Sequence, residues 1–263
     1  MKRALIVLVD GMRPDGLQQA NTPAIDRLIA AGASTLSAST VMPSVTLPCI
    51  TSLFFGSPPE VHGVTSNIWN PHHTGRSLLD VVARARGTAA SFYNWEPLRD
   101  LSRPGSLQAG ICLHNCGEPG GAGDTELTRV ALRTLERDPA DLVFVYLGHT
   151  DVAGHDSGWM TAPYIRAIEN ADQCIGTLVA GLRADSGDWL TVVTADHGGH
   201  GTGHGTESEA DMTIPVILSG DPAIASGTRL ADATNIIDIA PTVARWLGVP
   251  SPTEWHGQAI RLT

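Results

Sequence analysis

The sequence predicts an α/β fold whose sheet is mostly parallel and covered by helices on both faces. Three continuous apolar runs support this prediction, over residues 4–9, 142–147 and 190–195. Runs of this kind suit strands that are buried on both faces, as in a parallel sheet. Helical spacing of apolar residues alternates with these runs, which favours a layered α/β domain. The 263 residues can bury a large core, and no linker divides them, so we expect one domain over residues 1–263.

In the N-terminal part, proline and glycine mark the ends of the elements. Pro23 lies in the first turn of a predicted helix whose apolar stripe includes Ile25 and Leu28, and Gly32 ends it. The pattern then predicts a strand over 34–40, a helix over about 49–55, a helix over about 77–85 and a strand over 89–93.

Helical periodicity is clearer in the C-terminal part. One helix is predicted from Asp124 to the strand at 142–147, and a long amphipathic helix over about 165–182. A strand at 213–218 carries a proline near its start, which favours an edge or a first position. A last helix is predicted over 236–247, whereas the Gly- and Pro-rich region 97–123 shows no clear pattern.

An aspartate follows each of the three apolar runs, at Asp10, Asp151 and Asp196. Ligands of such folds bind beyond the carboxyl ends of the strands, so we expect the three carboxylates to gather there. Carboxylates and imidazoles together suit a divalent transition metal. Three aspartates and three histidines divide into two sites of three ligands each, the arrangement of a metal pair that acts on phosphate esters. The histidines near these aspartates are His155, His197, His200 and His204.

A metal pair of this kind needs a nucleophile, and Thr46 is the strongest candidate. It lies just ahead of a predicted helix, whose N-terminal amides and dipole favour a phosphate oxygen. A threonine hydroxyl becomes an effective nucleophile when a metal lowers its pKa. Ser44 is the competing hydroxyl two residues before it.

The bulk composition excludes some partners. A formal charge of -10 argues against a surface for nucleic-acid polymers or anionic membranes, because both need a basic patch. No apolar run reaches the ~18 residues of a membrane span, and Asp10 interrupts the only stretch similar to a signal peptide, so we expect a cytoplasmic protein. Four scattered cysteines form no disulfide framework, and Cys112 and Cys116 are expected to belong to an ordinary loop or a disulfide rather than a third metal site.

Several segments together resemble the alkaline phosphatase superfamily, and within it the nucleotide pyrophosphatase/phosphodiesterase branch. The resemblance covers most of residues 1–70 and 145–220 in the family's order. It is carried by Asp10-Gly11-Met12-Arg13, Thr22-Pro23-Ala24-Ile25-Asp26-Arg27-Leu28, Pro43-Ser44-Val45-Thr46-Leu47-Pro48, His62-Gly63 with Asn67, Asp151 with Gly154-His155, Asp196-His197-Gly198, and His204-Gly205.

This resemblance implies a three-layer sandwich that acts as a hydrolase with two Zn²⁺ ions. One zinc would be held by Asp151, His155 and His204. The other would be held by Asp10, Asp196, His197 and the Thr46 oxygen. Thr46 would attack phosphorus and form a phosphothreonine intermediate, and Asn67 would donate a hydrogen bond to a phosphate oxygen. Because His204-Gly205-Thr206 fits the motif, His204 is preferred over His200.

The chain also departs from its relatives. His204 follows Asp196 within eight residues, so a segment that intervenes in larger members is missing. The superfamily's sulfatases need Cys or Ser where Thr46 stands and Arg where Ile50 stands, which argues against a formylglycine sulfatase. The favoured function is hydrolysis of a small phosphodiester or nucleotide pyrophosphate. The alternatives are a phosphomonoesterase, a phosphonate hydrolase, a phosphomutase, and, in a different class, a non-catalytic metal-binding module.

Overall fold

One mixed sheet organises the fold. The computed structural model describes residues 2–183, 188–220 and 226–261, and this part of the chain contains an eight-stranded sheet. From edge to edge the strands are β4 (Ala109–Cys112), β3 (Ala89–Tyr93), β5 (Leu142–Leu147), β1 (Lys2–Val9), β6 (Asp188–Thr194), β7 (Thr213–Ser219), β2 (Ala33–Ser39) and β8 (Thr228–Arg229).

The direction of the strands confirms the mostly parallel sheet. β7 pairs antiparallel with both β6 and β2, whereas the other neighbouring strands pair in parallel. In the middle of the sheet, Val9 of β1 lies opposite Leu147 of β5, and Leu8 lies opposite Thr194 of β6. The chain therefore leaves these three central strands at the same level, and the residues that follow them can meet.

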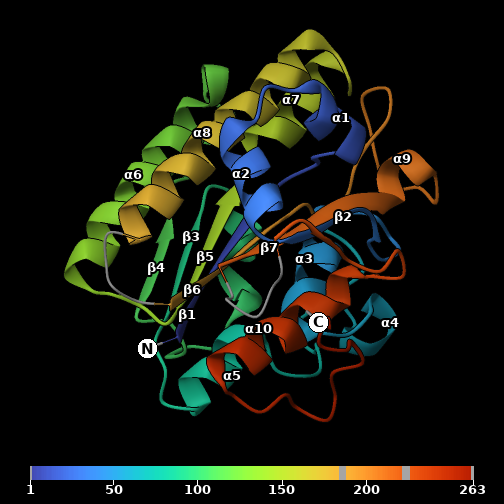
Figure 1. Cartoon of the computed structure of the whole chain (residues 1–263). Coiled ribbons are helices and arrows are strands. Elements are labelled where there is room, and N and C mark those ends of the chain that lie inside the picture. The colour runs from blue at the N-terminus through green and yellow to red at the C-terminus, as the bar shows by residue number, and fades with distance from the viewer. Residues whose placement is uncertain (1, 184–187, 221–225, 262–263) are drawn as a thin grey trace.

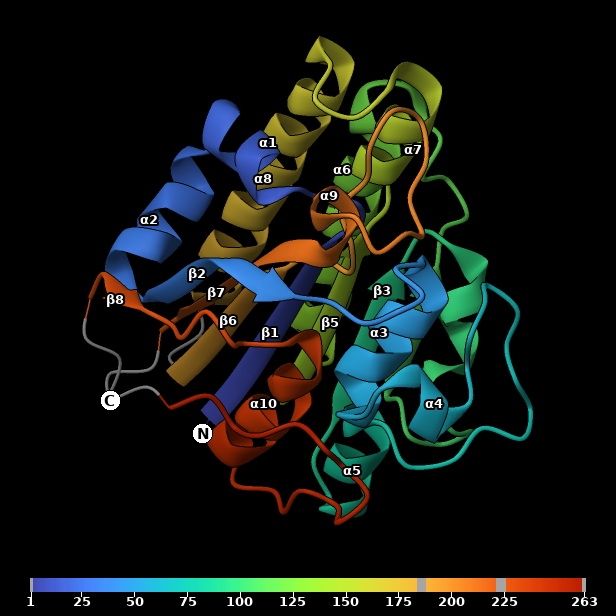
Figure 2. The ribbon, with the colours of Figure 1, turned by 90° about the vertical axis from the view of Figure 1, so that its right-hand side faces the viewer.

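Helices cover both faces of the sheet and complete a three-layer sandwich, as expected (Figures 1 and 2). One face carries α1 (Pro14–Gln19), α2 (Pro23–Ala31), α6 (Ala122–Arg137), α7 (His149–Ser157) and α8 (Ala162–Arg183). The other face carries α3 (Thr46–Phe55), α4 (Pro59–His62), α5 (Leu78–Arg84) and α10 (Ile239–Leu247). The short α9 (Glu209–Met212) precedes β7, and single 3₁₀ turns lie at Glu96–Leu101, Pro119–Gly121 and Ile236–Asp238.

The core follows from the apolar runs that predicted it. All residues of β1 from Ala4 to Val9 are buried, as is all of β5. These strands lie inside the sheet with helices on both sides, so their side chains have no solvent-facing side and the runs need no polar alternation. Most predicted elements, from α2 to α10, lie within a few residues of their expected places.

Two helices differ from the prediction. The first is α7, for which the sequence predicts no helix because it has no apolar stripe, and Asp151 lies within it. Instead, the carboxylate of Asp124 accepts hydrogen bonds from the N–H groups of Gly148 and His149 and so caps the start of α7 from a distant element. α3 begins at Thr46 and not near residue 49, because Pro48 falls in the first turn, where a missing N–H costs no helical hydrogen bond.

β7 also differs, since it lies inside the sheet rather than at its edge. Pro215 is tolerated there because the pairing with β2 shifts register between Thr35 and Ala38, and the pairing with β6 ends at Val216. The proline therefore removes no ladder hydrogen bond.

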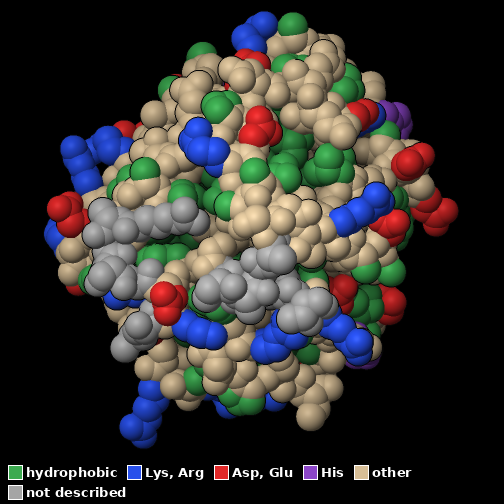
Figure 3. Space-filling view, viewed as in Figure 1, with side chains coloured by type: hydrophobic (Ala, Val, Ile, Leu, Met, Phe, Trp, Pro, Cys, Tyr) green, Lys and Arg blue, Asp and Glu red, His purple; other side chains and the backbone are tan. Residues whose placement is uncertain are grey.

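The surface seen in Figure 3 has no large patch of one charge. Basic and acidic side chains are interspersed over this face, and the hydrophobic ones form small separate groups. Among the described residues, no helix is both long enough and apolar enough to cross a membrane.

Candidate metal centre at the strand ends

The predicted metal ligands come together beyond the carboxyl ends of β1, β5 and β6. Two groups of three have their ligand atoms within 4.8 Å of one another, and both include His197. In one group, the His197 Nε2 lies 3.3 Å from Asp10 Oδ1 and 3.3 Å from Asp196 Oδ2. In the other, the Nε2 of His204 lies 3.7 Å from Asp151 Oδ1. His197 thus stands between the two halves of the centre.

His155 lies at the rim of this centre. Its Nε2 is 3.4 Å from Asp151 Oδ2, because the two residues are four apart on α7 and share one face of the helix. Its side chain is 44% exposed, whereas that of His197 is fully buried. His155 is not among the two compact groups, although its ring packs 5.1 Å from the ring of His204.

Backbone carbonyls set the tautomer of all three histidines. The Nδ1 atoms of His155, His197 and His204 lie 2.8–2.9 Å from the carbonyl oxygens of Thr202, Gly198 and Ser44, respectively. A carbonyl oxygen only accepts hydrogen bonds, so Nδ1 must carry the proton and Nε2 of the neutral ring is left bare. Each bare Nε2 faces the carboxylates, which is the arrangement of metal-binding histidines.

The carboxylates retain unsatisfied oxygens. Asp10 Oδ1, Asp151 Oδ1 and Asp196 Oδ2 are buried and accept no hydrogen bond within the described structure. Burial, followed by the nearby charges of Asp196 and Asp151, raises the pKa of Asp10 well above its usual range. Burial likewise raises the pKa of Asp151. Unpaired buried carboxylate oxygens are costly, and a bound cation is the partner that removes this cost.

Thr46 faces the same centre from α3. As the first residue of that helix, it places its Oγ1 3.2 Å from the Nε2 of His197. The Thr46 N–H has no hydrogen-bond partner among the described residues, Leu47 N–H is already bonded, and Pro48 has no N–H. One free amide at a helix N-terminus therefore accompanies the hydroxyl.

Ser44, the competing hydroxyl, is engaged elsewhere. It is fully buried, and its Oγ donates a hydrogen bond of 2.8 Å to the carbonyl oxygen of Thr206. Its own carbonyl accepts from His204. Ser44 thus joins the loop before α3 to the segment that carries His204.

Asn67 is held beside Thr46. Its Oδ1 accepts a 2.9 Å hydrogen bond from the Leu47 N–H. This contact fixes which end of the amide is used, so the Nδ2 group is the end that can donate to a ligand.

His200 belongs to a different cluster. Its Nδ1 lies 2.7 Å from Asp211 Oδ1, and its side chain is 52% exposed. Asp211 is itself fully buried and also accepts hydrogen bonds from the Thr206 N–H and hydroxyl. His200 therefore supports the loop that contains His204, and it points to a carboxylate that is not part of the centre.

Sequence reasoning missed two residues that support the centre. The hydroxyl of Tyr146 donates to Asp10 Oδ2 from inside β5, and burial raises the pKa of this tyrosine. Asp124 caps α7 and also accepts a 2.6 Å hydrogen bond from Asn94, and burial raises its pKa to about 7. In the sequence, Tyr146 is a polar group inside an apolar run, and Asp124 is an acid at the start of a predicted helix. Neither pattern shows which residue the side chain contacts, because both partners are distant in the sequence.

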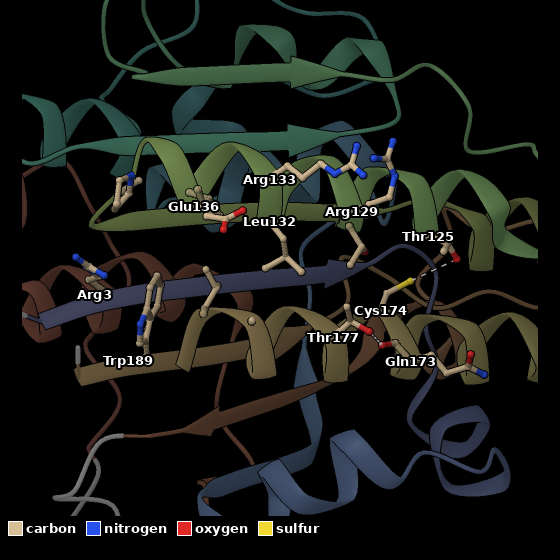
Figure 4. A pocket seen from close by; sticks show the side chains of 16 residues that line it. Arg3, Thr125, Arg129, Leu132, Arg133, Glu136, Gln173, Cys174, Thr177 and Trp189 are labelled. Atoms are coloured by element: carbon tan, nitrogen blue, oxygen red, sulfur yellow. Dashed lines mark hydrogen bonds between the residues drawn. The ribbon is translucent and has the colours of Figure 1, made fainter. Parts of the chain in front are cut away.

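A separate hollow of about 760 Å³ lies between α6 and α8, as Figure 4 shows. Arg3 and Trp189, which line one end of it, stand at the starts of β1 and β6. No aspartate or histidine is among the described residues that line it. This hollow is therefore distinct from the candidate metal centre, which lies at the other end of these strands.

Comparison with known proteins shows the family of this chain. The profile of the type I phosphodiesterase / nucleotide pyrophosphatase family matches residues 4–210, most of the chain. A 2,3-bisphosphoglycerate-independent phosphoglycerate mutase of Shewanella denitrificans is 34% identical over 143 residues, which are 52% of this chain and 26% of the mutase. The chain spans about a quarter of the length of the curated mutases it matches.

Solved structures share the fold at low sequence identity. A murine ectonucleotide pyrophosphatase / phosphodiesterase 5 in complex with AMP superposes with a TM-score of 0.79 at 14% identity, covering 96% of both chains. A phosphonate monoester hydrolase from Silicibacter pomeroyi gives 0.77 at 16% identity, covering 98% of this chain and 75% of the other. From the family match and the shared fold together, the chain belongs to the type I phosphodiesterase / nucleotide pyrophosphatase family of the alkaline phosphatase superfamily.

Proposed function

We propose that this protein is a zinc-dependent hydrolase of small phosphodiesters or nucleotide pyrophosphates, with Thr46 as its nucleophile. One observation carries the proposal: the Thr46 hydroxyl contacts the unprotonated Nε2 of His197, at the centre where three carboxylates each keep a buried, unsatisfied oxygen. The family match supports hydrolytic chemistry on phosphoric esters.

The donor set fits a pair of divalent zinc ions. Asp10, Asp196 and His197 would hold one ion together with the Thr46 oxygen. Asp151, His155 and His204 would hold the other, as the sequence suggests, with His155 completing the set from the rim. Two such ions would supply positive charge to both the attacking and the leaving oxygen of a displacement at phosphorus.

The chain's own residues then orient the reaction. α3 holds the Thr46 oxygen toward the centre and keeps its N–H free for a phosphate oxygen. Asn67 is fixed through its Oδ1, so its Nδ2 is available to a second phosphate oxygen. The hydroxyl of Ser44, by contrast, already donates to Thr206, which disfavours it as the nucleophile.

The substrate class follows from the charges around Thr46. Arg13 is the basic residue nearest to Asp10 in sequence, but its guanidinium bonds to the Asp15 carboxylate and to the Gly199 carbonyl. Beside Asn67, the side chain of Ile68 is 79% exposed, one of two exposed large hydrophobic residues that the structure describes. A phosphate with one negative charge and an apolar second substituent suits these surroundings better than a monoester dianion.

The matched mutases favour one alternative, a phosphomutase. The match covers 26–27% of those proteins and does not extend to the rest of a mutase. A hydrolase that transfers the phosphoryl group from Thr46 to water needs no second substrate site, so we prefer hydrolysis. The phosphomonoesterase, phosphonate hydrolase and non-catalytic alternatives are separated by the experiments below.

The two competing histidines give a first prediction. His204→Ala should weaken binding of one zinc ion by more than the ~10–100-fold that loss of an outer partner costs, because a direct ligand is removed. His200→Ala should weaken it less than about tenfold, since His200 contacts Asp211 and not the centre. Zinc content and affinity, measured by competition with a chelator, check this ranking. The reverse order would transfer the ligand role to His200.

The nucleophile gives a second prediction. Thr46→Ala should lower kcat on the order of 10³-fold or more while the protein still folds and binds zinc, because only the attacking oxygen is lost. Ser44→Ala is the matched control and should keep kcat within about tenfold. Steady-state kinetics with zinc saturating measure both variants. An active Thr46→Ala enzyme with an inactive Ser44→Ala enzyme would reverse the assignment.

Substrate charge gives a third prediction. After removal of metal and reconstitution with zinc, the enzyme should prefer an aryl phosphodiester to the monoester with the same leaving group. The physical reason is that no described contact joins a lysine or arginine side chain to Thr46 or Asn67, and that the guanidinium of Arg13 is already bonded to Asp15 and Gly199. The measurement is kcat/KM for the pair, with the metal-free protein as control. A monoester preference of tenfold, ~1.4 kcal/mol in transition-state binding, would contradict the diester assignment, and no zinc-dependent turnover of either would favour the non-catalytic alternative.

A further inference from the structure

Trp159 touches all three segments that bring the candidate ligands together. It is buried, with 6% of its surface exposed, and it follows the end of α7 by two residues. Its indole N–H donates a 3.0 Å hydrogen bond to the carbonyl oxygen of Gly11, directly after Asp10. Its backbone N–H donates to the carbonyl oxygen of Gly201, in the loop that leads to His204.

Two glycines allow the Trp159 ring to lie between α7 and this loop. A side-chain carbon added at Gly154, on α7, would lie 2.6 Å from the ring, and one added at Gly199 would lie 2.2 Å from it. Both separations are far shorter than a van der Waals contact, so no larger residue fits without displacing the ring. The indole therefore fills the space between the helix that carries Asp151 and the loop that carries His204.

The same ring packs against two of the candidate ligands. The ring of His155 meets it edge-on at 5.1 Å and 84°, and the ring of His204 meets it at 5.9 Å and 62°. His155 is the most exposed candidate ligand, and its Nδ1 is held by the Thr202 carbonyl alone. Packing against Trp159, together with the contacts of His155 to Asp151 and to the His204 ring, restricts how the His155 ring can turn.

We propose that Trp159 is a positioning residue that sets the spacing of His155 and His204, and thereby the affinity of the Asp151 half of the centre. Near the other half, its described contacts are with the backbone at Gly11 and Gly199 and not with the side chains of Asp10, Asp196 or His197, so that half should depend on it less. The inference about affinity rests on the proposed metal function. The inference about spacing rests on the contacts alone.

Trp246 offers a matched control. It is 5% exposed, and its indole N–H donates a 2.7 Å hydrogen bond to the carbonyl oxygen of Arg3, at the opposite end of β1 from Gly11. Trp159→Phe and Trp246→Phe therefore each remove one indole hydrogen bond to the backbone at one end of β1, and each shortens a buried side chain. Only the first change disturbs the ring beside the histidines.

The experiment compares the two variants in the full chain by two measurements. Hydrogen exchange of the metal-free proteins should be faster in Trp159→Phe over residues 149–157 and 198–206, and unchanged there in Trp246→Phe. Zinc titration should show one of the two ions bound about tenfold more weakly, or worse, in Trp159→Phe, with the other ion within about twofold of wild type. Both ions should bind normally to Trp246→Phe. The free energy of unfolding of both variants is measured as well, so that a loss of zinc affinity caused by general destabilisation can be recognised.

The outcomes separate the two proposals. If the wild-type protein binds two zinc ions and Trp159→Phe binds both normally, or binds both more weakly to the same degree as Trp246→Phe does, the positioning role is overturned. If the wild-type protein binds no zinc, the proposed function is overturned, and the exchange data alone then judge the spacing. Equal exchange in the two variants would overturn the positioning role in either case.

Discussion

The rest of this structure depends on three carboxylates that gather beyond the carboxyl ends of the central parallel strands. Asp10, Asp151 and Asp196 each keep one buried oxygen without a protein donor. Burial and mutual repulsion raise the pKa of Asp10, so the apolar surroundings and the neighbouring acids both oppose its charge. The proposed pair of cations would offset this cost, with the unprotonated Nε2 atoms of the three histidines divided between the two ions.

The outer contacts of the centre serve this constraint. Carbonyl oxygens hold the three histidines in the tautomer that leaves Nε2 free, and the Tyr146 hydroxyl occupies the oxygen of Asp10 that points away. Asp124 caps α7, which carries two candidate ligands. Asp10, Asp196 and His197 thus stand just after strands, and Asp151 and His155 stand on a helix that Asp124 caps. His204 lies in a loop that its hydrogen bond to the Ser44 carbonyl holds in place, so the candidate ligands keep their geometry without a metal.

The sequence predicted the sheet and the gathering of the aspartates because these depend on local pattern. A continuous apolar run indicates a strand covered on both faces, and parallel strands bring their carboxyl ends together. The sequence did not predict which side chains contact and support the candidate ligands, because these side chains come from distant parts of the chain. α7 has no apolar stripe and depends on Asp124 for its start. In the sequence, nothing distinguishes Trp159 from the other apolar residues. The structure shows its role, because Gly154 and Gly199 pack directly against its ring.

The two histidines that compete for one role illustrate the same limit. His200 and His204 are four residues apart in the same loop, and only the resemblance to a family separated them in the sequence. In the structure, the buried Asp211 engages His200, while His204 stacks on His197 with ring centroids 3.8 Å apart. The long-range partner of each ring, and not its local sequence, decides which histidine faces the aspartates.

Anomalous diffraction at the zinc edge, from crystals of the zinc-loaded protein, tests the central claim most directly. The account predicts two peaks roughly 3.5–4 Å apart. One should lie within bonding distance of Asp10, Asp196 and His197, and the other within bonding distance of Asp151 and His204. A single peak, a peak on His200, or no peak near the strand ends would contradict it.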